Sequence, residues 1–179
     1  MKFFTLFLTI GFTLFVSCFA QSIAAEIDNY RISVDDQISI TVFNEVDLSI
    51  EKVRVSGNGT ISMPLLGQVV IKDLTTIEVE QKITAQLLKG YLKKPNVTVT
   101  ITEYRPFYIH GEIKKPSSYP YKKGLTIEKA VALAGGFTER ASRKDISLVS
   151  EDDKENIKTV NLNDPIKPGD VITISESFF

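Results

Sequence analysis

The chain has 179 residues, enough for one medium-sized domain or for two small ones, each with a modest core. Hydrophobic residues make up 43% of it and charged residues 24%, which is ordinary for a globular protein. Beyond residue 25 there are 20 basic and 22 acidic residues, a net charge of −2 (20 − 22) that provides no basic field for phosphates and argues against DNA or RNA as a partner.

The N-terminus has the layout of a secretory signal peptide. Lys2 precedes an apolar run, Phe3–Val16, and small residues follow it. We therefore predict a signal peptide over residues 1–25 and a mature protein outside the cytoplasm. A retained membrane anchor is the alternative, although the run is short for crossing a bilayer. Cys18 follows an imperfect lipobox and is either removed or lipidated. No cysteine follows it, so no internal disulfide can form.

The first elements after residue 25 are predicted to be strands. Apolar residues at even positions predict a strand pair broken at Asp35-Asp36. Val53 and Val55 alternate into Ser56–Gly59, where Asn58-Gly59 supplies positive φ, and Ile61 and Met63 alternate out, which predicts a β-hairpin. Pro64 indicates an edge or a bulge there. The apolar residues at even positions in the predicted strand pair around Asp35-Asp36 are Ile32, Val34, Ile38, Ile40 and Val42.

A helix and a strand complete the first predicted domain, residues 26–104. Thr75 and Glu78 have capping-box spacing and mark the helix start. The apolar positions recur every four residues, and the helix is expected to end near residues 90–92, before Pro95. Val97, Val99 and Ile101 then alternate with threonines as a half-buried strand. The apolar positions that recur every four residues along the predicted helix are Val79, Ile83, Leu87 and Tyr91.

The second predicted domain covers residues 105–179 and begins at Arg105-Pro106. Strands are expected over residues 107–113, 119–122, 146–149, 157–160 and 171–174. Thr126 caps a helix that ends at Gly135-Gly136. This order predicts a β-grasp-like unit, so the fold class is α+β with two small domains. The inward helix residues are Ile127, Ala130, Val131 and Ala134. The segments Asp36–Ile40 and Asp170–Ile174 are weakly similar to each other, because each has a turn aspartate before an alternating strand.

An ordered set of motifs resembles the polysaccharide export family, the Wza-like proteins of Gram-negative capsule and exopolysaccharide secretion. The motifs are ISMPLLG at Ile61–Gly67, Leu74-Thr75, PNVTV at Pro95–Val99, GEIKKPSSY at Gly111–Tyr119, and the Leu125–Gly136 segment. The resemblance runs from about residue 30 to residue 173. The family usually has Gly-Asp where this chain has Asp35-Asp36, so the tight turn there is expected to be built differently.

The resemblance implies a non-enzymatic export component with an N-terminal export domain and a C-terminal soluble-ligand-binding β-grasp (SLBB) domain. It also implies a periplasmic protein associated with the outer membrane. The resemblance further implies that this protein forms a homo-oligomeric ring that passes a polysaccharide and works with an inner-membrane polymerisation and export apparatus. The five residues after the last predicted strand, Ser175–Phe179, are too few for a spanning helix. We therefore expect a separate outer-membrane partner. Two alternatives stay open: a monomeric periplasmic carbohydrate-binding or sensing module, and an envelope structural protein without glycan contact.

The sequence contains no recognisable catalytic constellation. His110 is the only histidine and is expected on a strand surface. The spacing of Glu103 and Glu112 does not place two carboxylates across a cleft, as a glycosidase requires. No cofactor and no metal are expected. Candidate sugar contacts are aromatic, because sugar rings stack on such faces, although the same tyrosines could simply cover a sheet. They are Tyr104, Tyr108, Tyr119 and Tyr121.

Overall fold

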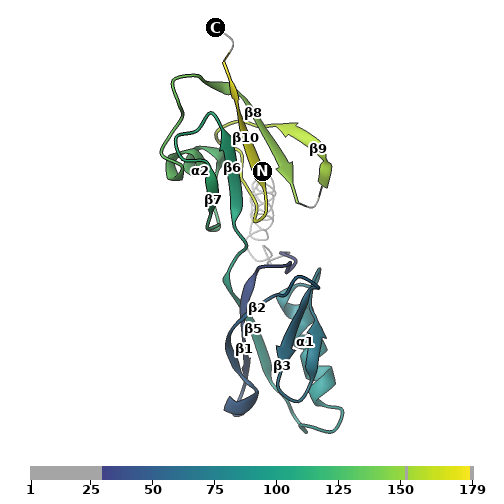
Figure 1. The fold of residues 1–179 in the computed structure, drawn as a ribbon. Coiled ribbons are helices and arrows are strands. Elements are labelled where there is room, and N and C mark those ends of the chain that lie inside the picture. The colour runs from purple at the N-terminus through teal and green to yellow at the C-terminus, as the bar shows by residue number, and fades with distance from the viewer. Residues whose placement is uncertain (1–29, 152, 178–179) are drawn as a thin grey trace, which may run out of the picture. The chain divides into compact units, whose positions relative to one another are not determined.

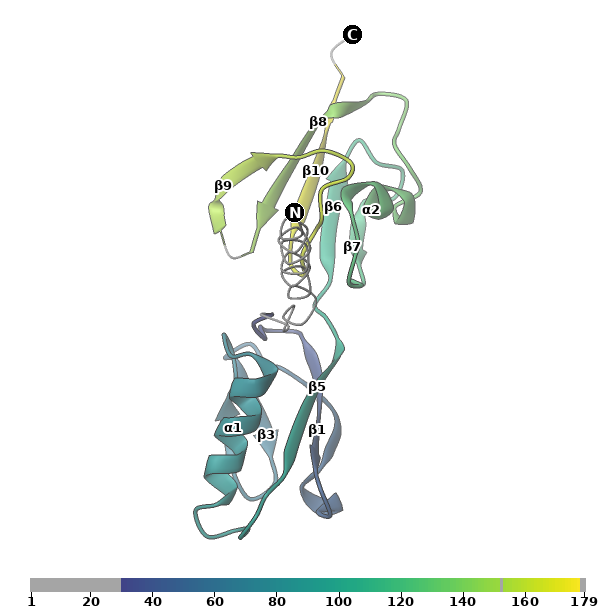
Figure 2. The ribbon, with the colours of Figure 1, turned by 180° about the vertical axis from the view of Figure 1, so that it is seen from behind.

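The computed structural model describes residues 30–151 and 153–177. Their buried apolar side chains form two separate cores, one from residues 32–99 and one from residues 107–174. Each core combines one α-helix with several strands, as Figures 1 and 2 show from opposite sides. The predicted α+β fold with two small domains is confirmed. The predicted signal peptide, with Cys18, lies outside the described residues.

The sheet of the first domain has three antiparallel strands in the order β2-β1-β5. They are β1 (Gln37–Val42), β2 (Ile50–Arg54) and β5 (Val97–Glu103), and a short 3-10 helix, η1 (Val46–Leu48), joins the first two. The prediction of a strand before Asp35 is wrong, because residues 33–36 form a turn. Ile32 is nevertheless buried in the core, while Val34 is only half-buried.

The predicted hairpin between residues 53–55 and 61–63 is wrong in its pairing. The strand β3 (Thr60–Met63) pairs with β4 (Gly67–Val70), whereas β2 pairs with β1 in the other sheet. Pro64 lies in the β3–β4 turn rather than within a strand, and Leu65 in that turn has a φ of 64°. Of the dipeptide Asn58-Gly59, only Gly59 has positive φ, at 77°.

The helix α1 (Thr76–Leu87) begins as predicted, since Thr75 and Glu78 form both hydrogen bonds of the capping box. The backbone N–H of Thr75 donates to the Glu78 carboxylate and lowers the pKa of that group. Val79, Ile83 and Leu87 are buried as predicted. Tyr91 is 50% exposed and lies beyond the helix, which ends earlier than expected.

The helix α1 packs against β5. There the Glu80 carboxylate accepts a hydrogen bond of 2.8 Å from the Val99 N–H. This bond satisfies a donor on the edge strand of the three-stranded sheet. Among the described residues, no helix is both long enough and apolar enough to span a bilayer.

The second domain is a five-stranded sheet with one helix, in the strand order β7-β6-β10-β8-β9. The strand β10 pairs in parallel with β6 and antiparallel with β8. The strand β7 pairs with β6 and begins two residues earlier than the strand predicted at 119–122. The elements are β6 (Phe107–Gly111), β7 (Ser117–Tyr119), α2 (Ile127–Leu133), β8 (Ala141–Ser150), β9 (Asp153–Thr159) and β10 (Val171–Glu176).

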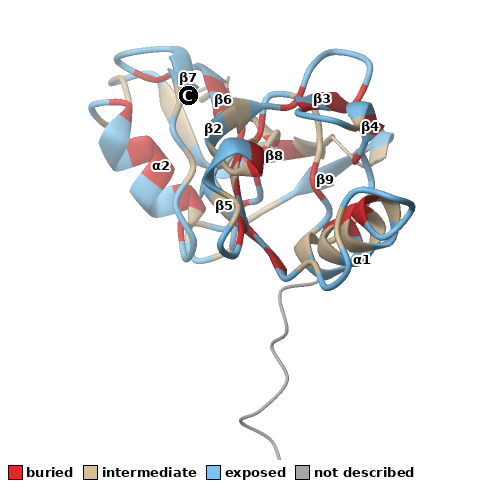
Figure 3. Cartoon of the chain, turned by 90° about the horizontal axis from the view of Figure 1, so that it is seen from below, coloured by how far each residue is buried: buried red, intermediate tan, exposed pale blue. Residues whose placement is uncertain are grey.

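The helix α2 buries the four residues predicted to face inward. Thr126 caps its N-terminus by accepting from the Lys129 N–H, and Gly135 and Gly136 follow with φ values of 81° and 89°. Figure 3 shows buried and exposed stretches side by side on both helices, as expected for helices with one face on a core. The sheet therefore has one face under α2 and one face not covered by it.

Candidate ligand-binding cleft

Two turns of the same construction lead into β1 and β10. In residues 33–36 the Asp36 carboxylate accepts from the Ser33 N–H at 2.7 Å, and in residues 167–170 the Asp170 carboxylate accepts from the Lys167 N–H at the same distance. Both turns also close with a backbone bond of 3.3 Å between the same two positions. The weak sequence similarity between residues 36–40 and 170–174 therefore corresponds to the same turn geometry before each strand.

The third residue of each turn has left-handed φ, 70° at Asp35 and 84° at Gly169. This is the conformation that a type II turn requires, and aspartate tolerates it better than most residues. In the first turn Asp35 thus takes the left-handed conformation that Gly169 takes in the second. At Gly169 an added Cβ would overlap the Glu151 carboxylate and lie 2.8 Å from Arg105 Nε, so the close approach requires glycine.

Arg105 connects a carboxylate of the first domain with one of the second. Its backbone N–H donates to Asp36 Oδ1 at 2.8 Å, and its Nη1 lies 3.5 Å from Asp36 Oδ2. Its Nε donates to Glu151 Oε2 at 2.5 Å. Arg105 and Asp36 are 7% and 0% exposed, so this cation is balanced by carboxylates rather than by water. Sequence reasoning assigned Arg105 only to a boundary and missed this role.

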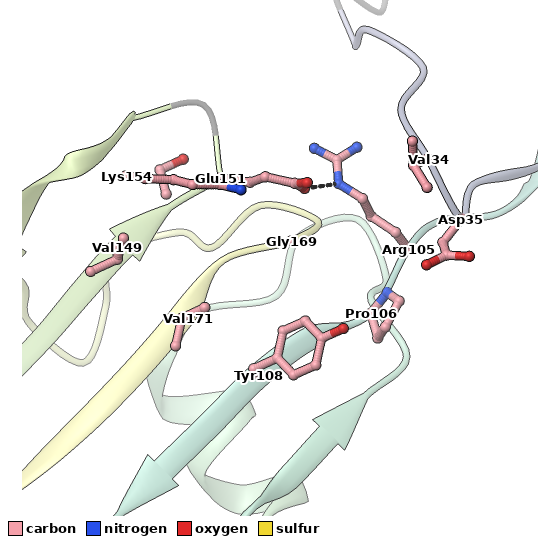
Figure 4. A pocket seen from close by; sticks show the side chains of 11 residues that line it. Val34, Asp35, Arg105, Pro106, Tyr108, Val149, Glu151, Lys154, Gly169 and Val171 are labelled. Carbon is pink, nitrogen blue, oxygen red and sulfur yellow. Dashed lines mark hydrogen bonds and ion pairs between the residues drawn. The ribbon is translucent and has the colours of Figure 1, made fainter. Parts of the chain in front are cut away.

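A cleft of about 340 Å³ opens beside Arg105 (Figure 4). Tyr108 of β6 pairs with Val171 of β10, and Val171 pairs with Val149 of β8, so these three side chains form a row on the face that α2 leaves open. Phe107 and Ile109 point to the opposite face and are buried. The cleft is lined by Val34, Asp35, Arg105, Pro106, Tyr108, Val149, Ser150, Glu151, Lys154, Gly169 and Val171.

Several polar groups of the cleft keep their hydrogen-bonding capacity. Within the described ranges, the Lys154 ammonium and the Asp35 carboxylate form no ion pair, and the Tyr108 hydroxyl has no hydrogen-bond partner. Tyr108 is 45% exposed. Donors and acceptors thus surround an apolar row, which is the arrangement that binds an amphipathic small molecule.

The structure does not bring the four predicted tyrosines to one surface. Tyr104 and Tyr121 pack edge to face with ring centres 5.5 Å apart. Tyr119 stacks on Phe107 at 5.9 Å, on the core side of the sheet, and its hydroxyl donates to the Lys115 carbonyl. Tyr108 alone of the four lines the cleft. Ligand binding by any of them stays a prediction.

The polar residues considered for catalysis lie apart. His110 is on the exposed face of β6, as predicted, and its Nε2 is 3.0 Å from the Thr173 hydroxyl. The Glu112 carboxylate accepts from the Thr138 hydroxyl, and Glu103 is 3.9 Å from an Arg54 nitrogen. Over residues 30–151 and 153–177, no group of three or more histidine, cysteine or acidic side chains could hold a metal ion.

Comparisons with known proteins agree with the fold. Residues 24–102 match the family described as polysaccharide biosynthesis/export protein, and residues 106–157 match the SLBB domain. The exopolysaccharide production protein ExoF of Rhizobium meliloti (strain 1021) is 36% identical over 125 residues, which cover 63% of this chain and 30% of that relative. The two matched regions follow each other in the order that the motifs predicted, so the chain carries a polysaccharide biosynthesis/export domain followed by an SLBB domain.

Proposed function

We propose that this protein takes part in exopolysaccharide export as a non-enzymatic subunit of a translocation conduit. The observation that carries the proposal is the export domain followed directly by an SLBB domain, each folded around its own core. The similarity to a protein named for exopolysaccharide production supports the same process. Specificity in such a conduit comes from the width and the polar lining of a passage, not from bond chemistry.

The conduit that we propose is a ring of identical subunits in the periplasm, associated with the outer membrane. It would receive the growing capsular or exopolysaccharide chain from an inner-membrane polymerisation and export apparatus, and would deliver it to a separate outer-membrane partner. Native mass spectrometry of the protein tests the ring, and crosslinking in cells followed by identification of the captured proteins tests the two partners.

Deletion of the gene tests the export role. We expect extracellular polysaccharide to fall strongly in the deletion strain and to return when the gene is restored. A second restoration with Tyr91→Ala, an exposed substitution outside the cleft, serves as the control for expression level. Unchanged polysaccharide in the medium of the deletion strain would contradict the proposal and would favour an envelope protein without glycan contact.

A monomeric carbohydrate-binding or sensing module is the second candidate. It is favoured by one observation, the exposed Tyr108 ring at the wall of a cleft. A protein that stays monomeric in native mass spectrometry, and whose deletion changes polysaccharide synthesis but not its export, would support this alternative. Polymer retained inside the cell envelope after deletion would support the conduit instead.

We also propose domain limits at residues 26–104 and 105–179, after a signal peptide over residues 1–25. The matched regions stop and restart close to Arg105, which supports a boundary there. Separate expression of the two segments tests it. Both should show cooperative unfolding, with the first segment weakened because it loses the Arg105 partner of the buried Asp36.

A further inference from the structure

We propose that the cleft beside Arg105 binds an uncharged hexose unit of a glycan chain. The proposal rests on the proposed function in one respect, since an export protein meets a glycan. The ligand class itself follows from the geometry and the charge of the cleft. Its volume of about 340 Å³ lies within the range of about 300–1,000 Å³ that is typical of small-molecule sites.

The floor of the cleft suits the face of a sugar ring. Tyr108, Val171 and Val149 are neighbours across three adjacent strands, and their side chains lie on the same face. Pro106 and Val34 add apolar surface at one side. A pyranose presents C–H groups on its faces, and these pack on an aromatic ring and aliphatic side chains in the way that apolar groups do.

The rim of the cleft offers both donors and acceptors. Figure 4 shows Lys154 and Glu151 on one side of the cleft and Asp35 on the other. A sugar hydroxyl both donates and accepts, so a hexose can use the Lys154 ammonium, the Tyr108 hydroxyl and the Asp35 carboxylate together. Hydrogen bonds to charged groups are stronger than neutral ones, which favours a fixed orientation of the ring.

The charges of the cleft favour a neutral sugar over an acidic one. Arg105 lies between Asp36 and Glu151, so its one positive charge faces two carboxylates and this group carries a net charge of −1 (1 − 2). The Lys154 ammonium and the Asp35 carboxylate remain, and they oppose each other in sign. A sugar carboxylate would be attracted by Lys154 but repelled by Asp35 and by the net negative charge of the Arg105 group, which is unfavourable at short range. The structure therefore assigns hexoses, not uronic acids, to this cleft.

A polar row beside the cleft gives the rest of the glycan a surface to follow. The register pairs His110 with Thr173, Thr173 with Ser147, and Ser147 with Thr159, across the strands β6, β10, β8 and β9. Each of these residues lies two positions along its strand from a member of the row Tyr108, Val171, Val149 and Ile157. Side chains two positions apart on a strand point to the same face, so both rows share one face of the sheet. Hydroxyl and imidazole groups in such a row can bond the hydroxyls of the next sugar units.

The test is a titration of the ¹⁵N-labelled full chain in a detergent without sugar groups, followed by NMR. Cellotetraose is the neutral probe and tetragalacturonate is the acidic one. We expect cellotetraose to bind and to shift the amide signals of β6, β8 and β10 around the cleft, and tetragalacturonate to bind at least several-fold more weakly. Tyr108→Ala should weaken cellotetraose binding about tenfold, whereas Tyr108→Phe keeps the ring and should lose less.

Tyr91→Ala is the matched control, because Tyr91 is 50% exposed and lies in the first domain, away from the cleft. It should leave binding unchanged. Tighter binding of tetragalacturonate, equal loss in the Tyr91 and Tyr108 variants, or shifts confined to other surfaces would overturn the proposal. So would the absence of any shift with cellotetraose. The export role would survive such a result, because it is tested separately by the polysaccharide of the deletion strain.

Discussion

The glycine at position 59 allows a quantitative test of how the first domain is held together. Gly59 has a φ of 77°, and a Cβ placed on it would lie 2.5 Å from Lys72 Cβ. Its carbonyl accepts from the N–H groups of both Ile71 and Lys72, at 2.9 and 3.1 Å. Gly59→Ala therefore introduces backbone strain and also a contact that cannot be relieved without moving the segment to which the carbonyl is bonded.

Gly67 isolates the first of these effects. Its φ is 69°, but no atom lies within 4 Å of an added Cβ, so Gly67→Ala adds only the strain of a left-handed alanine. That strain is about 1–2 kcal/mol. In Gly59→Ala the two hydrogen bonds are weakened as well, each worth about 1 kcal/mol net, which gives a total near 3–4 kcal/mol.

Differential scanning calorimetry of the full chain measures the difference between the two variants. A loss of 1 kcal/mol lowers the melting temperature of a domain of 60–100 residues by about 4–8 °C. We therefore expect the first-domain transition to fall roughly 10 °C further in Gly59→Ala than in Gly67→Ala, given the additional loss of about 2 kcal/mol. Equal melting temperatures of the two variants would refute the role of the contact with Lys72.

Four further predictions concern other parts of the chain. Val131→Asp places a charge in the second core, where the residue is 5% exposed, and should abolish cooperative unfolding of that domain; a cooperative calorimetric transition would contradict it. Arg105→Leu leaves a buried carboxylate without its cation and should cost about 3–5 kcal/mol in urea unfolding. The pKa of Glu78 in the folded state is below its ordinary value of 4.5, so the ionised Glu78 carboxylate stabilises the fold above pH 4.5. This stabilisation is lost as the pH falls through the lower pKa of the folded state. Glu78→Gln should thus reduce the stability difference between about pH 7 and about pH 3, measured by urea unfolding. The exported protein should lack Met1 by intact mass, and labelled palmitate that is incorporated, but not after Cys18→Ser, would show lipidation rather than simple cleavage.

Local signals in the sequence predicted the helices well. The capping box at Thr75 and Glu78 involves residues three positions apart, and the inward face of α2 follows from a spacing that any α-helix imposes. The same logic failed at Tyr91, where the four-residue pattern continues although the helix does not. Gly90, with a φ of 108°, follows the helix end and turns the chain away from it.

Strand pairing could not be predicted from periodicity. Alternation shows which face of a strand is buried, but not which strand lies beside it. Residues 53–55 and 61–63 flank a glycine turn, so they resembled a hairpin, yet β2 and β3 belong to different sheets. The cleft was missed for a related reason. Lys154 and Glu151 lie in an acidic segment that is typical of a solvated turn, and only the β8–β9 pairing places them beside Arg105 and Tyr108.

The open edge of β9 bears on how the protein behaves at high concentration. This strand ends the five-stranded sheet, and its Ile157 side chain is 71% exposed. Such an edge is a template for unwanted β-pairing between molecules and so for aggregation. The charged residues Lys154, Glu155 and Lys158 lie along β9. If two copies paired edge to edge along β9, in parallel and in register, each of these charges would lie beside its own copy. Salt screens this repulsion, with a screening length of about 10 Å at 0.1 M and about 3 Å at 1 M. Concentrated salt should therefore promote aggregation of the folded protein, and dilute buffer should keep it dispersed.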